Sequence, residues 1–201
     1  MRKGLLGAVL CLAMWSQAAL AGTVLVLGDS ISAAFGLDTR QGWVALLEKR
    51  LAEQGSSHRV VNASITGDTS AGGAARLPRL LAEHRPDWVI LGLGGNDGLR
   101  GLPPTQLQQN LAAMIDKAQA SGAQVVLLGM LLPPNYGVRY TTAFARVYTA
   151  LAEEKDVALV PFFLEGVGGV PTMMQNDGIH PALKSQPVLL ENVWPVLKPL
   201  L

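Results

Sequence analysis

Five short runs rich in valine, isoleucine and leucine recur along the chain, and their apolar residues are consecutive rather than alternating. They are Thr23–Leu27, Arg59–Asn62, Trp88–Leu93, Gln124–Leu128 and Val157–Val160. Consecutive apolar residues over this length are typical of strands that are covered on both faces of a sheet. The pattern therefore predicts five buried strands.

Between these runs, apolar residues recur at helical spacing, which predicts an amphipathic helix after each strand. The final stretch contains Pro195, which predicts a kink or an early stop because proline lacks a backbone N–H. The apolar stripes are Trp43, Leu46, Leu47 and Leu51; Leu77, Leu80 and Leu81; Leu107, Leu111, Met114, Ile115 and Ala118; Phe144, Val147, Tyr148 and Leu151; and Leu189, Val193, Trp194 and Leu197.

The predicted strands start 36, 29, 36 and 33 residues apart, which is the length of a strand–helix–strand unit. Alternating strands and helices favour a parallel sheet with helices on both faces, a three-layer α/β/α sandwich. We expect residues 22–201 to form one such domain. Ligands of these folds bind beyond the carboxyl ends of the strands, so the loops that follow the strands are where chemistry is expected.

The first 21 residues are interpreted as a signal peptide rather than as part of the fold. A positive start is followed by an uncharged apolar stretch, Gly4–Trp15, and Ala19-Leu20-Ala21 fits a cleavage site, with cleavage after Ala21. The alternative of a membrane anchor is disfavoured because the apolar stretch is shorter than the ~20 residues that a bilayer core requires. A lipoprotein reading would use Cys11, but Leu10 precedes it where a small residue is expected. We expect a periplasmic or secreted protein.

The charge and the cysteine content of the chain exclude several classes of function. The chain has 16 Lys and Arg against 15 Asp and Glu, and loss of Arg2 and Lys3 with the signal peptide leaves 14 against 15, a formal charge of −1. No basic patch for nucleic acid is indicated. The single cysteine, Cys11, excludes a disulfide framework and a cysteine-based metal site. We expect no cofactor, no metal, no stable insertion into a membrane, and a monomer.

Ser30 is the candidate nucleophile, because it follows the first predicted strand in Gly28-Asp29-Ser30-Ile31-Ser32. We expect it at a strand-to-helix turn, where the helix start offers free N–H groups and a positive dipole end. The alternative is that Ser30 only caps that helix. As a nucleophile, serine requires a base beside it.

His180 is the candidate base, and Asp177 is the group that orients it. Asp177 lies three residues upstream across a glycine-containing turn, so its carboxylate can bond one ring nitrogen and leave the other to take the serine proton. The alternative is an ordinary loop histidine. The other histidines, His58 and His84, lie in polar stretches before strands and are interpreted as surface residues.

Gly67 and Asn96 follow the second and third strands and could complete an oxyanion hole. Gly67 can offer its backbone N–H and Asn96 its side-chain amide. The alternatives are a turn glycine and an asparagine that stabilises a turn.

The segment Gly92–Gly98 superficially resembles a dinucleotide-binding fingerprint. A nucleotide site is disfavoured because the segment starts at the third strand, because Asp97 stands where a third small residue is required, and because no helix start is expected directly after it. A metal site is equally disfavoured, since no His-x-x-x-His pair and no calcium-loop spacing occur.

Four blocks taken together resemble the SGNH (GDSL-type) hydrolases. They are Gly28-Asp29-Ser30, Gly67, Gly94-x-Asn96-Asp97 and Asp177-x-x-His180, in the family's order over nearly the whole mature chain. Ser32–Leu37, Gly42-Trp43 and Asn192–Pro195 are most similar to the secreted thioesterase I, lysophospholipase and arylesterase group of Gram-negative bacteria. The resemblance implies the flavodoxin-like SGNH fold.

By position, the resemblance implies that Ser30 is the nucleophile, that His180 is the base and that Asp177 orients it. It also implies an oxyanion hole formed by Ser30, Gly67 and Asn96. Ile31 stands where some members carry leucine, and no chemistry is expected of it.

The resemblance and the candidate triad together predict hydrolysis of acyl or lipid esters through an acyl-enzyme. Thioesterase and lysophospholipase activities are expected as further activities of the same site. The expected partner is a small acyl ester or a lysophospholipid. The alternatives are a carbohydrate deacetylase, because the fold also serves that chemistry, and a non-catalytic periplasmic binding module.

Two loops are candidates for an acyl-chain pocket: Gly98–Pro104, with Leu102, and Leu131–Tyr136, with Leu132. Both combine apolar side chains with proline or glycine. The alternative is that they are ordinary surface connections.

Overall fold

Residues 21–201 are described by the structure, which is a computed structural model. The predicted signal peptide lies outside the described residues, apart from its last residue, and stays a prediction. The strands are β1 (Thr23–Gly28), β2 (Arg59–Asn62), β3 (Trp88–Gly92), β4 (Gln124–Leu128) and β5 (Ala158–Val160). The α-helices are α1 (Trp43–Glu53), α2 (Ser70–His84), α3 (Gly95–Leu99), α4 (Pro104–Ala120), α5 (Val138–Lys155) and α6 (Gln186–Leu197).

The five strands form one parallel sheet in the order β2-β1-β3-β4-β5. In one row across the sheet, Asn62 lies beside Val26, Val26 beside Ile90, and Ile90 beside Val126. Because all strands run the same way, their carboxyl ends meet at one edge. The loops that carry Ser30, Gly67 and Asn96 therefore leave the sheet at the same edge.

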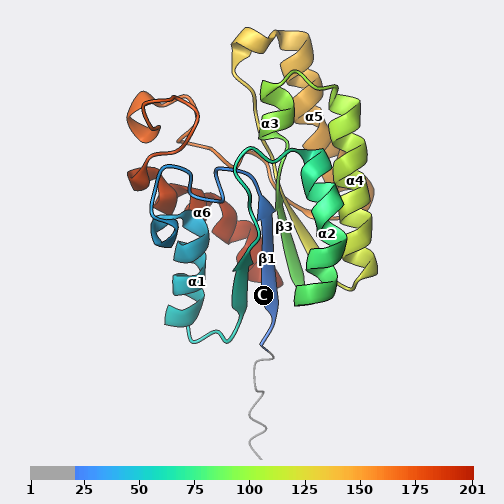
Figure 1. The fold of residues 1–201 in the computed structure, drawn as a ribbon, viewed down its shortest axis with the longest axis vertical. Helices are drawn as coiled ribbons and strands as arrows, with labels where there is room; N and C mark the ends of the chain where they lie inside the picture. Colours follow the sequence, from blue (N-terminus) through green and yellow to red (C-terminus); the bar gives the residue numbers. More distant parts are fainter. Residues whose placement is uncertain (1–20) are drawn as a thin grey trace, which may run out of the picture.

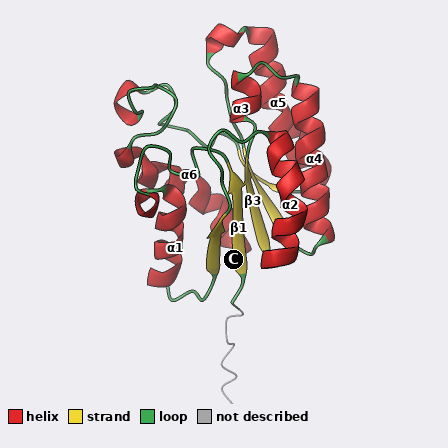
Figure 2. Cartoon of the chain, in the orientation of Figure 1, coloured by secondary structure: helices red, strands yellow, loops and turns green. Residues whose placement is uncertain are grey.

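Helices cover both faces of the sheet (Figure 1, Figure 2). On one face α1 packs against α6, and on the other α4 packs between α2 and α5. The predicted three-layer α/β/α sandwich is confirmed.

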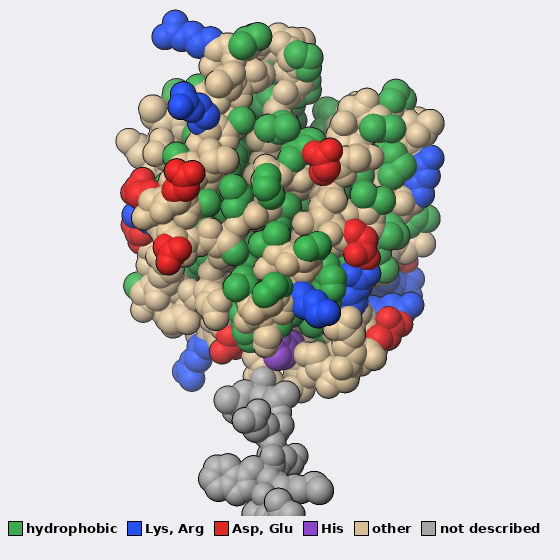
Figure 3. Space-filling view, turned by 180° about the vertical axis from the view of Figure 1, so that it is seen from behind, with side chains coloured by type: hydrophobic (Ala, Val, Ile, Leu, Met, Phe, Trp, Pro, Cys, Tyr) green, Lys and Arg blue, Asp and Glu red, His purple; other side chains and the backbone are tan. Residues whose placement is uncertain are grey.

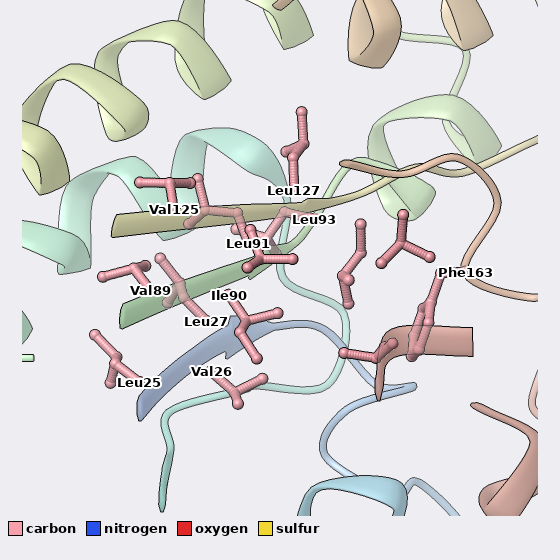
Figure 4. Packing of buried hydrophobic residues seen from close by; sticks show 14 of the residues in the cluster. Leu25, Val26, Leu27, Val89, Ile90, Leu91, Leu93, Val125, Leu127 and Phe163 are labelled. Atoms are coloured by element: carbon pink, nitrogen blue, oxygen red, sulfur yellow. The ribbon is translucent and has the colours of Figure 1, made fainter. Parts of the chain in front are cut away.

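Burial of the central strands explains their consecutive apolar residues. The side chains of Val24–Leu27, Val89–Leu91 and Val125–Leu128 are almost completely buried between the two helical layers (Figure 4). The edge strand β2 is only half-buried, and its terminal residues Arg59 and Asn62 are exposed. The consecutive apolar pattern is therefore strongest where both faces and both edges of a strand are covered.

The structure differs from the predicted elements in one additional helix and in several element ends. β1 runs one residue further than expected, to Gly28, and β3 ends one residue earlier, at Gly92. The short helix α3 lies in a glycine-rich stretch that carries no apolar stripe, so periodicity could not predict it. The last α-helix runs past Pro195 to Leu197 and continues as a 3₁₀ turn, so the stop comes two residues later than the proline. β5 starts at Ala158, one residue later than expected.

The start of α1 is tied to the loop that follows β1. Gly42 caps this helix without a side chain, and the N–H of Trp43 donates to the side-chain oxygen of Gln186 at 3.0 Å. The buried Trp43 ring donates to the hydroxyl of Ser32 at 3.1 Å. The loop that carries Ser30 is thus anchored to the core through the bond between Ser32 and the buried Trp43 ring.

Within residues 21–201, no helix is both long enough and apolar enough to cross a membrane. On the face drawn in Figure 3, basic and acidic side chains are interspersed among apolar ones.

Truncation of a central strand residue should destabilise the fold strongly. Ile90 is fully buried in β3, so Ile90→Ala should lower the free energy of unfolding by about 2–5 kcal/mol through lost contacts and a cavity. The matched control is Val138→Ala, because Val138 is 78% exposed and should change stability by less than about 0.5 kcal/mol. Urea unfolding followed by circular dichroism measures both, and equal effects would contradict this account of the core.

Candidate active site

Ser30 lies just beyond β1 in a tight turn rather than at a helix start. The turn is held by backbone bonds from Ala33 N–H to the Asp29 carbonyl at 2.9 Å and from Phe35 N–H to the Ser30 carbonyl at 3.0 Å. The next α-helix begins only at Trp43, so the expected strand-to-helix turn was wrong. Ser30 caps no helix, which removes the alternative interpretation of this residue. Ser30 is therefore not at the N-terminus of a helix, and the contribution expected from a helix start at this position is absent.

The structure brings Ser30 and His180 together across 150 residues of sequence. The His180 Nε2 atom lies 2.9 Å from the Ser30 hydroxyl, and its Nδ1 atom lies 2.6 Å from the Asp177 carboxylate. Ser30 is only 7% exposed. A hydroxyl, an imidazole and a carboxylate in series can remove the serine proton and stabilise the resulting imidazolium.

The hydrogen bonds that Asp177 accepts keep its carboxyl group ionised. Its second oxygen accepts the backbone N–H groups of His180 at 3.0 Å and of Ile179 at 2.9 Å. The N–H and ring of His180, with the N–H of Ile179, lower the pKa of the Asp177 carboxyl to about 2. The carboxylate is therefore available to orient the imidazole at any ordinary working pH.

Asp29, directly before Ser30, is a buried carboxyl to which the sequence analysis gave no role. One oxygen accepts the Ile31 N–H at 3.0 Å, and the other lies 3.4 Å from the side-chain nitrogen of Asn96. Burial raises the pKa of Asp29 to about 6, although the Ile31 N–H and the charge of His180 act against this rise.

Gly67 and Asn96 lie next to each other at the sheet edge. The Asn96 amide donates to the carbonyl of Asp68, the residue after Gly67, at 2.9 Å. Gly67 has a φ of +78°, a conformation that favours glycine, while the space around it is open. Backbone conformation, rather than lack of room, therefore requires glycine here.

Asn96 belongs to α3, and the neighbouring Asp97 fixes that helix. The buried Asp97 carboxylate accepts the backbone N–H of Ser70 at 2.8 Å and the Ser70 hydroxyl at 2.5 Å, and Asn110 donates to the same hydroxyl at 2.8 Å. These bonds join α3 to the start of α2 and to α4. A buried carboxyl requires such partners, and the acidic residue in the otherwise uncharged stretch after β3 was the available signal for a network that sequence reasoning missed.

Two arginines hold the backbone around Gly67. Arg100 donates to the Gly67 carbonyl at 3.0 Å, and Arg76 forms an ion pair with Asp68 and donates to the Ala63 carbonyl at 2.8 Å. The loop that presents the Gly67 N–H is thereby held from both sides. Neither arginine was identified from the sequence, because Arg76 lies within α2 and Arg100 ends α3, positions where an arginine is ordinarily a surface residue.

The two candidate pocket loops contact each other. The hydroxyls of Tyr136 and Tyr140 donate to the carbonyls of Leu99 at 3.1 Å and of Leu102 at 2.7 Å. Leu132 lies so close to Gly98 that a Cβ added there would be 2.5 Å from its methyl group. Leu102 and Leu132 are half-buried, so each combines contact with the protein and an exposed surface.

A hollow of about 330 Å³ lies at the opposite end of the sheet, around the starts of β4 and β5. It is remote from Ser30, because the strands begin there and end at the candidate site. It therefore has no part in the geometry around the serine.

The remaining sequence candidates lie elsewhere or differ from expectation. His58 is no surface residue: its ring stacks on Trp88 at 4.9 Å and both ring nitrogens are buried. The side chain of His84 is also mostly buried.

A short helix does begin inside Gly92–Gly98, so one reason for disfavouring a nucleotide site was wrong. The buried Asp97 carboxylate at that helix would nevertheless repel a phosphate. No cluster of three potential metal ligands occurs among the described residues.

Known proteins are similar to this chain in sequence and in fold. Residues 26–184 match the sequence model of the GDSL-like lipase/acylhydrolase family. The chain is 69% identical, over the full length of both proteins, to a Pseudomonas aeruginosa protein named esterase TesA. It is 47% identical, over 92% of this chain and 87% of the relative, to thioesterase 1/protease 1/lysophospholipase L1 of Escherichia coli K12. A crystal structure of TesA superimposes with a TM-score of 0.87 and 72% identity, covering 89% of this chain and 99% of the other.

The raised pKa of Asp29 predicts how stability depends on pH. The folded carboxyl titrates near 6 and the unfolded one near 3.8, so the folded state binds more protons between these values. The free energy of unfolding therefore falls as pH rises from about 4 to about 6, by about 3 kcal/mol from this group. Asp29→Asn should lack this loss and be more stable than the wild type at pH 8, but not at pH 4.

Urea unfolding of the wild type and Asp29→Asn at both pH values measures this difference. Glu48→Gln is the control, because Glu48 is exposed on α1 and takes no part in the site. A stability difference between the wild type and Asp29→Asn that does not change with pH would contradict the assignment of this titration to Asp29.

Proposed function

Because the chain belongs to the GDSL-like lipase/acylhydrolase family and is a carboxylic ester hydrolase, we propose that it cleaves acyl and lipid esters through a Ser30–His180–Asp177 triad. The observation that carries this proposal is the continuous chain of contacts from the Ser30 hydroxyl through both ring nitrogens of His180 to the Asp177 carboxylate, at 2.9 and 2.6 Å.

In the first half of the reaction, His180 Nε2 takes the Ser30 proton while the serine oxygen attacks the ester carbonyl carbon. The Asp177 carboxylate on Nδ1 keeps Nε2 unprotonated before attack and stabilises the imidazolium afterwards. The tetrahedral intermediate collapses when His180 returns the proton to the departing alcohol or thiol. An acyl group then remains on Ser30.

The negative oxygen of that intermediate requires donors at the sheet edge. The N–H groups of Ser30 and Gly67 and the Asn96 amide supply them in our proposal. The contact of Asn96 with the Asp68 carbonyl and the contact of Arg100 with the Gly67 carbonyl hold two of these donors in advance, so that little reorganisation is needed during reaction. Water then attacks the acyl-enzyme by the same sequence, with His180 as base, and releases the acid.

The substrate class follows from the surroundings of Ser30 and from the relatives. The Escherichia coli relative is named both a thioesterase and a lysophospholipase, and oxygen and sulfur esters pass through the same tetrahedral intermediate. Phe35, Ile65 and Ile179 are exposed apolar side chains close in sequence to Ser30, Gly67 and His180, as acyl-chain recognition requires. We infer that small acyl esters and lysophospholipids are the substrates, with thioesters as a further activity.

Localisation supports the same choice of substrate. Residues 1–21 serve in our proposal as a signal peptide cleaved after Ala21, and the domain of residues 22–201 acts in the periplasm or outside the cell, as a monomer. Acyl-coenzyme A and acyl carrier protein are cytoplasmic, so an exported enzyme meets carboxylic esters and lipids instead.

Ser30→Ala should lower kcat for hydrolysis of a chromogenic acyl ester by at least ~10³-fold, because the variant lacks the hydroxyl on which the acyl-enzyme forms in our proposal. Circular dichroism should remain that of the wild type. An organophosphate probe should label the wild type at Ser30 and leave the variant unlabelled. Ser121→Ala, remote from the sheet edge at the end of α4, is the matched control and should retain full activity.

Wild-type activity in Ser30→Ala would refute the triad. A panel of esters, acyl-coenzyme A, lysophospholipids and acetylated sugars, applied to the mature wild type, separates the substrate classes. Cleavage of acetylated sugars alone would favour the deacetylase alternative over acyl-ester hydrolysis.

The two candidate pocket leucines should determine acyl-chain preference. Leu132→Ala and Leu102→Ala each remove side-chain volume beside α3 and should shift the optimum of kcat/KM towards longer acyl chains. A series of chromogenic esters of increasing chain length measures the shift. Leu46→Ala, a half-buried position on α1, is the control and should leave the preference unchanged. An unchanged optimum in both pocket variants would show that these loops are only surface connections.

A further inference from the structure

Three hydrogen bonds join the backbone of Ser30 to the backbone of His180, in addition to the bond between their side chains. The Ser30 carbonyl accepts the Phe35 N–H at 3.0 Å. The Phe35 carbonyl accepts the side-chain amide of Gln175 at 2.7 Å. The Gln175 N–H donates to the His180 carbonyl at 2.7 Å. Gln175 is thus the member of this series that bonds both to the turn after Ser30 and to the His180 loop.

The Gln175 side chain is held in place by its own surroundings. Its amide nitrogen also donates to the Pro181 carbonyl at 3.1 Å, so both bonds are made from the one NH₂ group. Gly36 lies against the other end of the amide, where a Cβ would be 2.3 Å from the Gln175 oxygen, and its φ is +77°. Glycine at position 36 therefore leaves the room that the Gln175 side chain occupies.

The same turn places an aromatic ring against the imidazole. The ring of Phe35 lies 4.4 Å from that of His180, centroid to centroid, and is tilted by 36°. Asp177 holds His180 at the ring edge, and Phe35 contacts one ring face. A displacement of the turn relative to the His180 loop would move both the serine and this contact.

The Ser30 turn and the His180 loop need a contact that fixes their relative position, because the bond between Asp177 and His180 lies within one of the two segments. Asp177 and His180 are three residues apart in one loop, so their bond orients the imidazole within that loop but leaves its distance to Ser30 undetermined. From β5 to α6 the chain contains turns, short 3₁₀ segments and one isolated antiparallel bridge between Met174 and Pro181, and none of these belongs to the sheet. Direct contacts between the Ser30 turn and the His180 loop therefore contribute to the position of His180 relative to β1, in addition to the anchoring of α6 to α1.

We propose that Gln175 is a positioning residue that holds His180 Nε2 within hydrogen-bonding distance of Ser30 Oγ by tying the Phe35 carbonyl to the His180 loop. This inference rests on the proposed function, because it assigns the tie to the proton transfer from Ser30 to His180. A misplacement of about 1 Å in such a pair is sufficient to reduce rate by ~10²-fold.

The test compares Gln175→Met, which keeps the length of the side chain but donates no hydrogen bond, with Gln175→Ala. Both should lower kcat for a chromogenic ester by ~10–100-fold while KM changes by less than about 2-fold, because the tie acts on proton transfer rather than on substrate binding. The rate constant for labelling of Ser30 by an organophosphate should fall in parallel, since labelling requires the same proton transfer.

Asn192→Ala is the matched control. The Asn192 amide also donates to two backbone carbonyls, those of Phe163 at 3.0 Å and of Glu165 at 2.9 Å, but neither belongs to the Ser30 turn or to the Asp177–His180 segment. It should lower the unfolding temperature about as much as Gln175→Ala and leave kcat and the labelling rate at wild-type values. An equal loss of kcat in Asn192→Ala would show that the effect is only structural and would overturn the proposal.

Wild-type kcat and labelling rate in Gln175→Met would also overturn it, and so would a rise in KM alone. These failures are distinct from failure of the proposed function. If Ser30→Ala is inactive and the Gln175 variants behave as the wild type, only the positioning role is lost. If Ser30→Ala retains activity, the triad itself is wrong.

Discussion

Burial of β1, β3 and β4 on both faces is the constraint on which the rest of the structure depends. A strand covered by helices on each face must be connected through those helices, so successive strands run parallel and their carboxyl ends meet at one edge. Gly28 and Gly92 end neighbouring strands in register there. Loops that are far apart in sequence, including those of Ser30 and Asn96, are brought together by this arrangement.

Three carboxyl groups at this edge differ in environment and therefore in role. Asp177 is partly exposed and receives two backbone N–H groups, which keep its pKa near 2. Asp29 is buried behind the serine, and burial raises its pKa to about 6. Asp97 is buried as well, but it accepts two bonds from Ser70 and joins three helices. Of the three, only the Asp177 carboxylate contacts the His180 ring, so it is the one that orients the imidazole.

Loops rather than regular elements carry the reacting groups, so their geometry depends on specific ties. Arg100 and Arg76 hold the Gly67 loop, and two tyrosine hydroxyls hold the segment after α3. Gln175 performs the same task between the His180 loop and the Ser30 turn. Apart from the ion pair of Arg76 with Asp68, each of these contacts ends on a backbone carbonyl and so depends on the position of the chain rather than on the side chain at that position.

The sequence alone predicted the five strands, the parallel sheet and the helices with apolar stripes. Strands buried on both faces carry consecutive apolar residues, and helices buried on one face carry apolar residues at helical spacing, so both kinds of element can be recognised in the sequence. Three of the four polar blocks could be located from the strand ends, since chemistry in this fold belongs there. The fourth, Asp177-x-x-His180, lies well beyond β5 and was found from the spacing of its aspartate and histidine and from the family resemblance. Helix α3 could not, because its glycines and polar residues carry no period, and the expected helix at Ser30 proved to be a turn. Only the tertiary structure decided the distance between Ser30 and His180, the burial of Asp29 and the bonds of Gln175, because these depend on contacts between segments up to 150 residues apart that no local pattern encodes.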